Sequence, residues 1–445
     1  MLRKRVAWSQ RVCGLMLTIA LATTATADTL SEAIAADYAT TLEDLFIHFH
    51  QNPELSHLEF ETAKRLATEL RSLGYDVTEG IGGTGIVAVL TNGNGPTVML
   101  RADMDGLPVG EKSGLPYAST ARQTDITGKE QPVMHACGHD VHITALVGTA
   151  RQLAARTGQW SGTLVLIGQP AEERGSGARA MLEDGLYERF PKPDYAIAFH
   201  VAADHPSGKI EVPLVVVGSS ADSVDVVVYG VGSHGAAPHK GIDPVLIAAQ
   251  IVVTLQSVVS RTINPLEPGV ITVGAIHGGT KHNIISESVD MQLTVRADSF
   301  ETRALLLESI DRVAKGVALS LGMPEDKLPK VTRSQTETTP PTINDEQTAR
   351  RIKSAFVEHF GDETIVEQPR DGMGAEDFAY FVEPEFGVKG IYFVVGGTPK
   401  EEVEDAPAHH SPLFKIEPEP AITVGVEAMT IAALELFEVP SSSAK

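Results

Sequence analysis

The stretch Thr97–Asp105, TVMLRADMD, is an apolar run that ends in charged residues. The run predicts a short buried strand, with Arg101, Asp103 and Asp105 placed where that strand ends. Runs of the same kind recur at residues 85–90, 162–169, 194–200 and 390–397. Segments with helical apolar spacing lie among them, at residues 42–50, 57–73, about 142–155, 178–183 and 420–437. Strands that alternate with helices predict an α/β sheet with helices on both faces.

The pattern changes near Val212. From there the predicted order is strand, helix, two strands and helix, at residues 222–230, 243–260, 269–277, 288–297 and 301–321. This order predicts a small two-layer α/β unit inserted into the larger domain. The segment 324–346 is rich in proline, threonine and charge, and we expect it to be the return linker. The expected division is a large domain formed by residues 28–212 and 326–445, with an inserted domain at residues 213–325.

The first residues combine a basic start, an apolar run from Val12 to Ala22 and small residues that end at Ala27. This pattern is typical of a secretory signal peptide at residues 1–27, with a predicted cut after Ala27. The apolar run is shorter than the roughly 20 residues of a spanning helix, which favours cleavage over a membrane anchor. We expect no later stretch to span a membrane, and we expect a secreted or periplasmic mature protein.

The composition is that of a soluble globular protein with an excess of acidic residues. Hydrophobic residues make up 42% of the chain, and the formal net charge is -22 at pH 7. Such a charge makes nucleic acid and anionic membrane surfaces poor partners. There are two cysteines, Cys13 and Cys137, and the predicted cut removes the first. An exported mature protein would therefore have no internal disulfide, and Cys137 would be a lone thiol.

Three predicted strands end in carboxylates or imidazole. Asp103 and Asp105 follow the first, Glu172 and Glu173 the second, and His200 ends the third. In open α/β sheets ligands bind outside the carboxyl ends of the strands, so we expect these groups to converge on one crevice. Taken singly, the aspartates could be caps and His200 a core histidine. The adjacent glutamates are more informative, because they repel each other unless a cation or a shared proton compensates them.

The stretch Met134–Asp140, MHACGHD, places Cys137 and His139 two positions apart. Residues at i and i+2 do not share a helix face, so both are expected on a loop before a helix, with Gly138 permitting the turn. Thiolate, imidazole and carboxylate are transition-metal ligands, and two metals about 3.5–4 Å apart could share such a set. The alternative is a catalytic thiol activated by His139, which leaves the glutamate pair without a role. The metal site is favoured.

Further histidines lie in turns rich in glycine or proline. His409 and His410 occur near the end of the chain, whereas His234 and the pair His282–Asn283 occur in the inserted unit. Because surface histidines are common, each of these residues alone is a weak signal of function.

Taken together, the motifs resemble the amidohydrolase branch of the M20 metallopeptidase family, which includes hippurate hydrolases, N-acyl-amino-acid amidohydrolases and plant auxin-conjugate hydrolases. In family order they are RADMDGLP (101–108), MHACGHDVH (134–142), QPAEE (169–173), SHGAAPH (233–239), MGAEDFAYF (373–381) and HSPLF (410–414). They extend over nearly the whole mature chain. The resemblance implies a large zinc-peptidase-like α/β catalytic domain with an inserted, smaller ferredoxin-like lid or dimerisation domain.

The resemblance also implies a set of site residues. Two divalent metal ions per subunit, zinc or manganese with cobalt or nickel as further candidates, would be held by Cys137, His139, Glu173, His200 and His410. Glu172 would be the general base, and Asp105 would orient a ligand. His234 would reach over the substrate, in some relatives from the opposite subunit, and Asn283 would lie near the scissile group or the substrate carboxylate.

The implied activity is hydrolysis of N-acyl amino acids or peptide-like amides by metal-activated water, in a homodimer formed through the inserted domain. A metallo-dipeptidase or carboxypeptidase of the same fold is the enzymatic alternative. A non-catalytic periplasmic binding protein is disfavoured, because it should lack Glu172 or one of the five ligands and none is missing. The segment 119–133 is longer than the expected connector and could shape the pocket rim.

Overall fold

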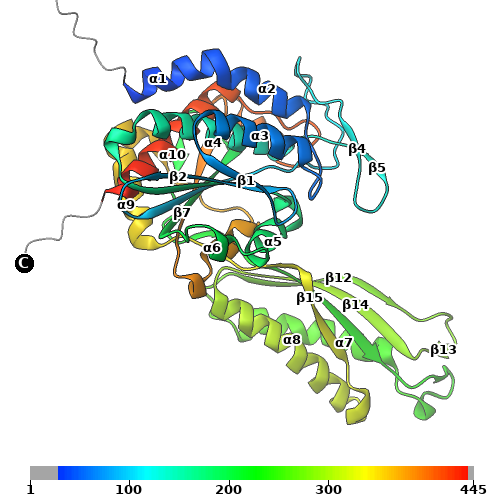
Figure 1. The fold of residues 1–445 in the computed structure, drawn as a ribbon. Coiled ribbons are helices and arrows are strands. Elements are labelled where there is room, and N and C mark those ends of the chain that lie inside the picture. Colours follow the sequence, from blue (N-terminus) through cyan, green and yellow to red (C-terminus); the bar gives the residue numbers. More distant parts are fainter. Residues whose placement is uncertain (1–28, 439–445) are drawn as a thin grey trace, which may run out of the picture.

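The computed structural model describes residues 29–438, which form a large α/β domain and a smaller α/β domain that projects from it (Figure 1). The α/β class, with a smaller two-layer unit inserted in the larger domain, is as the sequence predicts. The predicted signal sequence, its cut after Ala27 and Cys13 lie outside the described residues.

The large domain is built on an eight-stranded mixed sheet in the order β1, β2, β6, β3, β7, β18, β8, β17. The strand bounds, in that order, are Asp76–Ile81, Gly85–Asn92, Gly162–Gln169, Thr97–Asp103, Tyr195–Pro206, Lys389–Thr398, Ile210–Glu211 and Ile365–Val366. The central strands β6, β3, β7 and β18 are parallel. Their carboxyl ends therefore lie at the same edge of the sheet, as the sequence analysis expects.

Helices cover both faces of this sheet. One face carries α1 (Leu30–Asp37), α2 (Glu43–Gln51), α3 (Phe60–Ser72), α4 (His139–Ala155), α9 (Glu346–Phe360) and α10 (Pro418–Phe437). The other carries α5 (Gly177–Glu183), α6 (Leu186–Arg189) and the 3-10 helix η7 (Asp377–Val382). Val98 and Leu100 of β3 pack in the first core and Met99 in the second. Because both faces are buried, the residues Val98–Leu100 of this strand form a continuous apolar run and do not alternate with polar residues.

The small domain has the order β10 (Ala221–Tyr229), α7 (Pro244–Arg261), β12 (Gly269–Gly278), β14 (Ser288–Ala297), α8 (Phe300–Ser320) and β15 (Lys330–Thr339). Its antiparallel sheet has the strand order β12, β14, β10, β15, which is the ferredoxin-like arrangement. The helices α7 and α8 pack on one face of this sheet through an apolar core of their own. The second layer of the unit is thus formed by these two helices alone.

The prediction that residues 324–346 are a linker, with the inserted domain ending at 325, is wrong. Residues Lys330–Thr339 form β15, which pairs with β10. The sequence pattern does not predict this strand, because β15 lies at the edge of the sheet and most of its residues are exposed and polar. The chain returns to the large domain after Thr339, where β16 (Thr342–Ile343) pairs with β9 (Val216–Gly218), the strand that precedes the small domain.

Two further expectations are modified by the structure. By length and hydropathy, α7 and α10 would suffice to span a membrane, contrary to the sequence expectation, although two-thirds of α10 is buried inside the protein. The segment 119–133 forms the hairpin β4 (Arg122–Thr124) and β5 (Glu130–Pro132). Of the described residues that line the main cleft, none belongs to this hairpin.

Candidate metal centre

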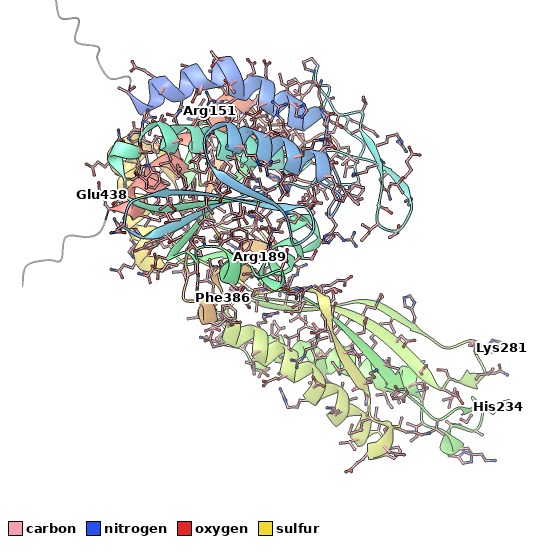
Figure 2. The ribbon with its side chains drawn as sticks, in the orientation of Figure 1. Arg151, Arg189, His234, Lys281, Phe386 and Glu438 are labelled. Atoms are coloured by element: carbon pink, nitrogen blue, oxygen red, sulfur yellow. The ribbon has the colours of Figure 1, made fainter. Side chains whose placement is uncertain are left out.

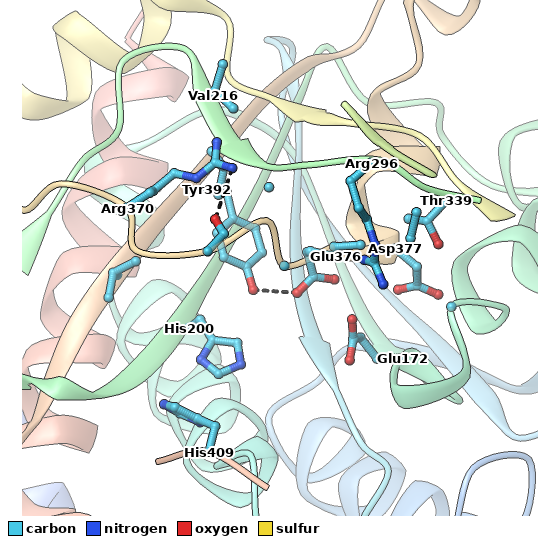
Figure 3. Close-up of a pocket in the computed structure, with 18 of the residues that line it drawn as sticks. Glu172, His200, Val216, Arg296, Thr339, Arg370, Glu376, Asp377, Tyr392 and His409 are labelled. Atoms are coloured by element: carbon cyan, nitrogen blue, oxygen red, sulfur yellow. Dashed lines mark hydrogen bonds between the residues drawn. The ribbon is translucent and has the colours of Figure 1, made fainter. Parts of the chain in front are cut away.

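The carboxyl ends of the parallel strands open on a cleft with a volume of about 1260 Å³. Its walls include Cys137, Glu172, Glu173, His200 and His410 (Figure 3 shows the part around Glu172 and His200). Asp103 ends β3, and Glu172 and Glu173 follow β6, as the crevice rule for open α/β sheets requires. The prediction that His200 ends its strand is wrong, because pairing with β18 extends β7 to Pro206.

All five residues implied as metal ligands lie together. Cys137, His139 and His200 have potential ligand atoms within 4.8 Å of one another, and so do Cys137, Glu173 and His410. Cys137 therefore belongs to two ligand groups at once. The Cys137 sulfur is 3.4 Å from Nε2 of His200, and Nε2 of His410 is 3.4 Å from Oε2 of Glu173. This arrangement suits two metal ions that both lie close to the Cys137 thiolate.

Unusual backbone conformations present these side chains. Gly138 precedes α4 with φ of 88°, and a Cβ at this position would collide with Val201. Glycine avoids both this clash and the strain of a positive φ, so Cys137 and His139 face one centre across a glycine turn. Ala171 has φ of 48° and His410 φ of 67°. Left-handed conformations of non-glycine residues cost free energy and cluster at functional sites, in agreement with their places beside Glu172 and in the HSP turn.

Asp105 is positioned to orient both the imidazole and the glutamate loop. Its Oδ1 lies 3.3 Å from Nδ1 of His139, and its two oxygens accept the backbone N–H groups of Glu172 and Glu173 at 3.1 Å. The Nε2 of His139 then faces Glu172 and Glu173, at 4.0 and 3.9 Å. Burial lowers the pKa of His139, but the carboxylates of Asp103 and Asp105 outweigh it and raise this pKa to about 10.

Burial shifts the pKa values of Cys137 and His200 in opposite directions. Burial, with the nearby Glu173 and Glu172, raises the pKa of the Cys137 thiol well above its ordinary value. Burial also lowers the pKa of His200, which keeps this imidazole neutral. A metal binds thiolate and neutral imidazole, so binding here would release the protons of Cys137 and His139.

The described site residues fit divalent metal ions. Nε2 of His139 and Oε1 of Glu173 are buried without a hydrogen-bond partner and lie 3.9 Å apart. Buried polar atoms are nearly always partnered, so orphaned donors that face one another indicate a bound ligand. Thiolate, imidazole and carboxylate together match transition metals such as zinc.

Glu172 also lies beside two carboxylates, Glu376 and Asp377, whose roles the sequence does not indicate. Ligand atoms of Glu172, Glu376 and Asp377 lie within 4.8 Å of one another. The buried guanidinium of Arg101 pairs with Glu376 at 2.8 Å, and the Tyr392 hydroxyl donates to the same carboxylate at 2.5 Å (Figure 3). Burial and the charges of Glu376 and Glu173 raise the pKa of Glu172 well above its ordinary value. A raised pKa strengthens a carboxylate as a base.

Arg101 lies in the motif RADMD, and Glu376 and Asp377 lie in the motif MGAEDF. No local sequence pattern predicts that these two motifs meet in the folded protein. Arg101 contacts Asp103 on its own strand at 2.6 Å and Glu376 far along the chain. His142 is a partial exception, because it follows His139 by three positions and so shares its helix face. Its potential ligand atom lies with those of Asp103 and His139.

The structure does not bring His234 and Asn283 into this cleft. Figure 2 shows His234 at the end of the small domain that is remote from the large domain. His234 is exposed in the short ribbon of β11 (Ser233–His234) and β13 (Ile284–Ile285), and Asn283 precedes β13. Of the described residues, neither of the two is among those that line the cleft of their own chain.

A buried histidine outside the ligand set contacts the first turn of α4. His50 of α2 places Nδ1 at 2.7 Å from Asp140 and Nε2 at 3.1 Å from Glu111. Because each ring nitrogen faces a carboxylate, both must carry protons and the ring is an imidazolium. Burial lowers the pKa of His50, but the hydrogen bonds to Asp140 and Glu111 outweigh it and raise this pKa to about 9.

This geometry predicts a pH-dependent contribution of His50 to stability. An unfolded histidine has a pKa of about 6.5, so the contribution is complete below about pH 6.5 and is lost as the pH rises through about 9. We expect His50→Gln to destabilise the protein by roughly 3 kcal/mol at about pH 6 and by far less at about pH 10. Urea unfolding of both proteins, with chelator present throughout, measures the difference. His48→Gln on the same helix is the control, and a penalty for His50→Gln that is independent of pH would contradict the assignment.

Residues 99–435 match the family described as peptidase family M20/M25/M40. The chain is 37% identical over 348 residues to a hippurate hydrolase of Campylobacter jejuni, which covers 78% of this chain and 86% of that protein. It is 35% identical over 396 residues to thermostable carboxypeptidase 2 of Saccharolobus solfataricus, and the alignment covers 87% of this chain and 93% of that protein. The structure is also similar to that of the YXEP protein of Bacillus subtilis, a dinuclear metal-binding peptidase from the M20 family. The TM-score is 0.73 at 28% sequence identity, and the match covers 90% of this chain and 98% of that chain.

Proposed function

Because this chain belongs to the peptidase family M20/M25/M40 and is a metal-dependent amidohydrolase, we propose that it cleaves the amide bond of N-acyl amino acids. The convergence of five thiol, imidazole and carboxylate groups, with Glu172 beside His139 and Glu173, carries the proposal. Two divalent ions would be held by Cys137 with His139 and His200, and by Cys137 with Glu173 and His410. Zinc, manganese, cobalt and nickel are the candidate ions.

The residues of this chain divide the remaining chemistry among themselves. When bound, the ions supply Lewis acidity and lower the pKa of a water. A carboxylate oxygen of Glu172 accepts the proton of the attacking water and passes it to the leaving nitrogen, which converts a poor amide leaving group into an amine. Asp105 holds the His139 ring and the backbone of Glu172 in one geometry, so the base and the ligand keep their relative positions.

The walls of the cleft suit a substrate with one apolar and one anionic part. The linker residues Leu214–Val217 add an apolar wall. Arg296 of the small domain points into the cleft near Glu172 (Figure 3). Its side chain is half-buried, and among the described residues its guanidinium makes one hydrogen bond, to the Met373 carbonyl at 3.5 Å. A half-buried cation with so little compensation suits a substrate carboxylate.

A substrate panel tests the proposed function. The purified protein would be stripped of metal, loaded separately with Mn²⁺, Zn²⁺, Co²⁺ or Ni²⁺, and assayed with hippurate, other N-acyl amino acids, dipeptides and carboxypeptidase substrates. We expect the highest kcat/KM on N-acyl amino acids. A preference for free dipeptides or longer peptides would support the dipeptidase or carboxypeptidase alternative, and no metal-dependent hydrolysis of any substrate would refute the assignment.

We further propose that the enzyme works as a homodimer through the small domain, with His234 and Asn283 acting in the cleft of the partner subunit. The edge strand β12 has a free side, and Val245, Leu246 and Val253 on α7 are exposed apolar residues. An unpaired edge beside exposed apolar side chains favours pairing with a second copy. The position of His234, remote from its own cleft, supports action in the partner's site.

Complementation tests this assembly. Two inactive variants, Glu172→Gln and His234→Ala, would be unfolded, mixed and refolded together. If His234 acts across the dimer, mixed dimers contain one intact site and activity returns. Inactivity of the mixture with confirmed mixed dimers would place His234 in the site of its own chain, and a monomer by light scattering would refute the dimer.

We propose that the mature protein is secreted or periplasmic after cleavage at Ala27. The basic, apolar and small residues of the first 27 positions support this proposal. Mass spectrometry of exported protein should find a chain that begins at Asp28, and a mature chain that retains Cys13 would contradict it.

A further inference from the structure

His142 is a buried histidine on α4 with both ring nitrogens engaged. Its side chain is 1% exposed, and its Nδ1 is 2.6 Å from Oδ1 of Asp103. Its Nε2 accepts the backbone N–H of Val201 at 2.9 Å. Since Nε2 accepts, the ring proton must sit on Nδ1, which donates to Asp103. No lone pair of His142 is left for a metal, although its ring lies close to His139 and Asp103.

The hydrogen bond from Val201 meets a need created by the sheet. The pairing of β3 with β7 ends at the residue pair Arg101 and Ala198, whereas β7 continues to Pro206. Within residues 29–438, no strand pairs with the N–H groups on that side of β7 beyond Ala198. Buried backbone N–H groups are almost always paired, and here an imidazole replaces the missing strand. His409 does the same for Ala203, two residues further along, at 3.1 Å.

Val201 in turn fixes the ring of His200. The Nδ1 of His200 donates to the carbonyl of Val201 at 2.6 Å, and its Nε2 is then directed at Cys137. Asp103 is itself held by Arg101 at 2.6 Å. A continuous chain of hydrogen bonds therefore runs from Arg101 through Asp103, His142 and Val201 to His200.

We propose that His142 is a positioning residue, which aims Nε2 of His200 at the metal centre by holding Val201. The inference rests on the proposed role of His200 as a metal ligand. Partners of metal-ligating histidines fix the ring orientation, and their loss lowers metal affinity by about 10–100-fold. His142 acts through the backbone of β7 and contacts neither the substrate nor the reacting atoms.

Two substitutions separate the contacts of His142. In His142→Asn the amide nitrogen can replace Nδ1 and donate to Asp103, but nothing reaches Val201. In His142→Gln the amide oxygen can reach the N–H of Val201. We expect His142→Asn to lower the affinity for Co²⁺ and Zn²⁺ by about 10–100-fold and His142→Gln to restore most of it. The affinities would be measured on the full mature chain by competition with a chromophoric chelator, together with the visible spectrum of bound Co²⁺.

The controls keep the inference falsifiable. Thr149→Ala, a buried change on the same helix, should leave the Co²⁺ spectrum unchanged, and circular dichroism of the metal-free proteins checks folding. If His142→Asn does not fold, His142→Met, which fills the same space without hydrogen bonds, replaces it. Wild-type affinity in these variants, or equal losses in His142→Asn and His142→Gln, would overturn the positioning role. Failure of the wild-type protein to bind metal would instead refute the proposed function itself.

Discussion

Replacing Glu172 with glutamine is expected to lower kcat for N-acyl amino acid hydrolysis by about 10²–10⁴-fold while both metal ions stay bound. The amide has nearly the shape of the carboxylate but cannot accept the proton of the attacking water. Glu172 lines the cleft and lies 4.0 Å from Nε2 of His139. The substitution removes a negative charge that is repelled by the carboxylates of Glu376 and Glu173. We therefore expect the variant to fold.

The neighbouring glutamate provides the matched comparison. Glu173→Gln should lower metal content as well as activity, because Glu173 faces both His139 and His410. The exposed Glu183→Gln on α5 should change neither. Steady-state kinetics and elemental analysis of each protein distinguish the roles. Near-normal turnover in Glu172→Gln would remove it as the base, and loss of an ion from this variant would make it a ligand instead.

Replacing Cys137 with serine is expected to lower the affinity for metal by more than about 100-fold and to abolish activity at low metal concentration. Cys137 belongs to both ligand groups, so its loss weakens two sites at once. Serine keeps the volume, but its hydroxyl does not ionise readily and is a poor ligand for zinc. Elemental analysis after dialysis against a weak chelator gives the number of ions retained.

The reactivity of the thiol provides an independent measurement. Burial and nearby carboxylates keep the free thiol protonated, and bound metal would occupy its sulfur. We therefore expect alkylation of Cys137, located by mass spectrometry, to be slow in the metal-loaded enzyme and to become faster when metal is removed and the pH is raised. Unchanged metal content in Cys137→Ser would contradict the ligand assignment, and full activity without metal would revive the thiol nucleophile.

Much of the fold could be predicted from local patterns. The apolar runs of β2, β3, β6 and β18 are bounded by loops rich in glycine and charge, and helical spacing marks α3 and α10. The strand β15 could not be predicted, because it is an edge strand whose exposed residues carry no apolar signal. Its neighbour β10 supplies the hydrogen bonds that define it, and that pairing joins residues about a hundred positions apart.

The candidate site divides in a similar way. Chain order and residue type place Cys137, His139, Glu172 and Glu173 at strand ends and turns, and the resemblance to a known family implies their roles. His200 is expected at the end of its strand but lies within β7, because the pairing with β18 that extends the strand is not a local property. The network of Arg101 with Glu376 and Asp377 has no such signature. In the sequence, Arg101 is only a charged residue near the end of a strand. Its burial cannot be predicted, because the carboxylates that pair with it come from another part of the chain.

The sequence by itself determined the class of fold, the donor types available to a metal and the edge of the sheet where they gather. It could do so because strand periodicity, glycine turns and parallel connections are local properties. Only the tertiary structure decided that Arg101 neutralises a pair of carboxylates from a distant part of the chain. It also decided that His142 binds β7 beyond the end of its pairing with β3, and that His234 lies away from its own cleft. These features depend on contacts between distant segments, whose free energy is gained only when both segments are in place.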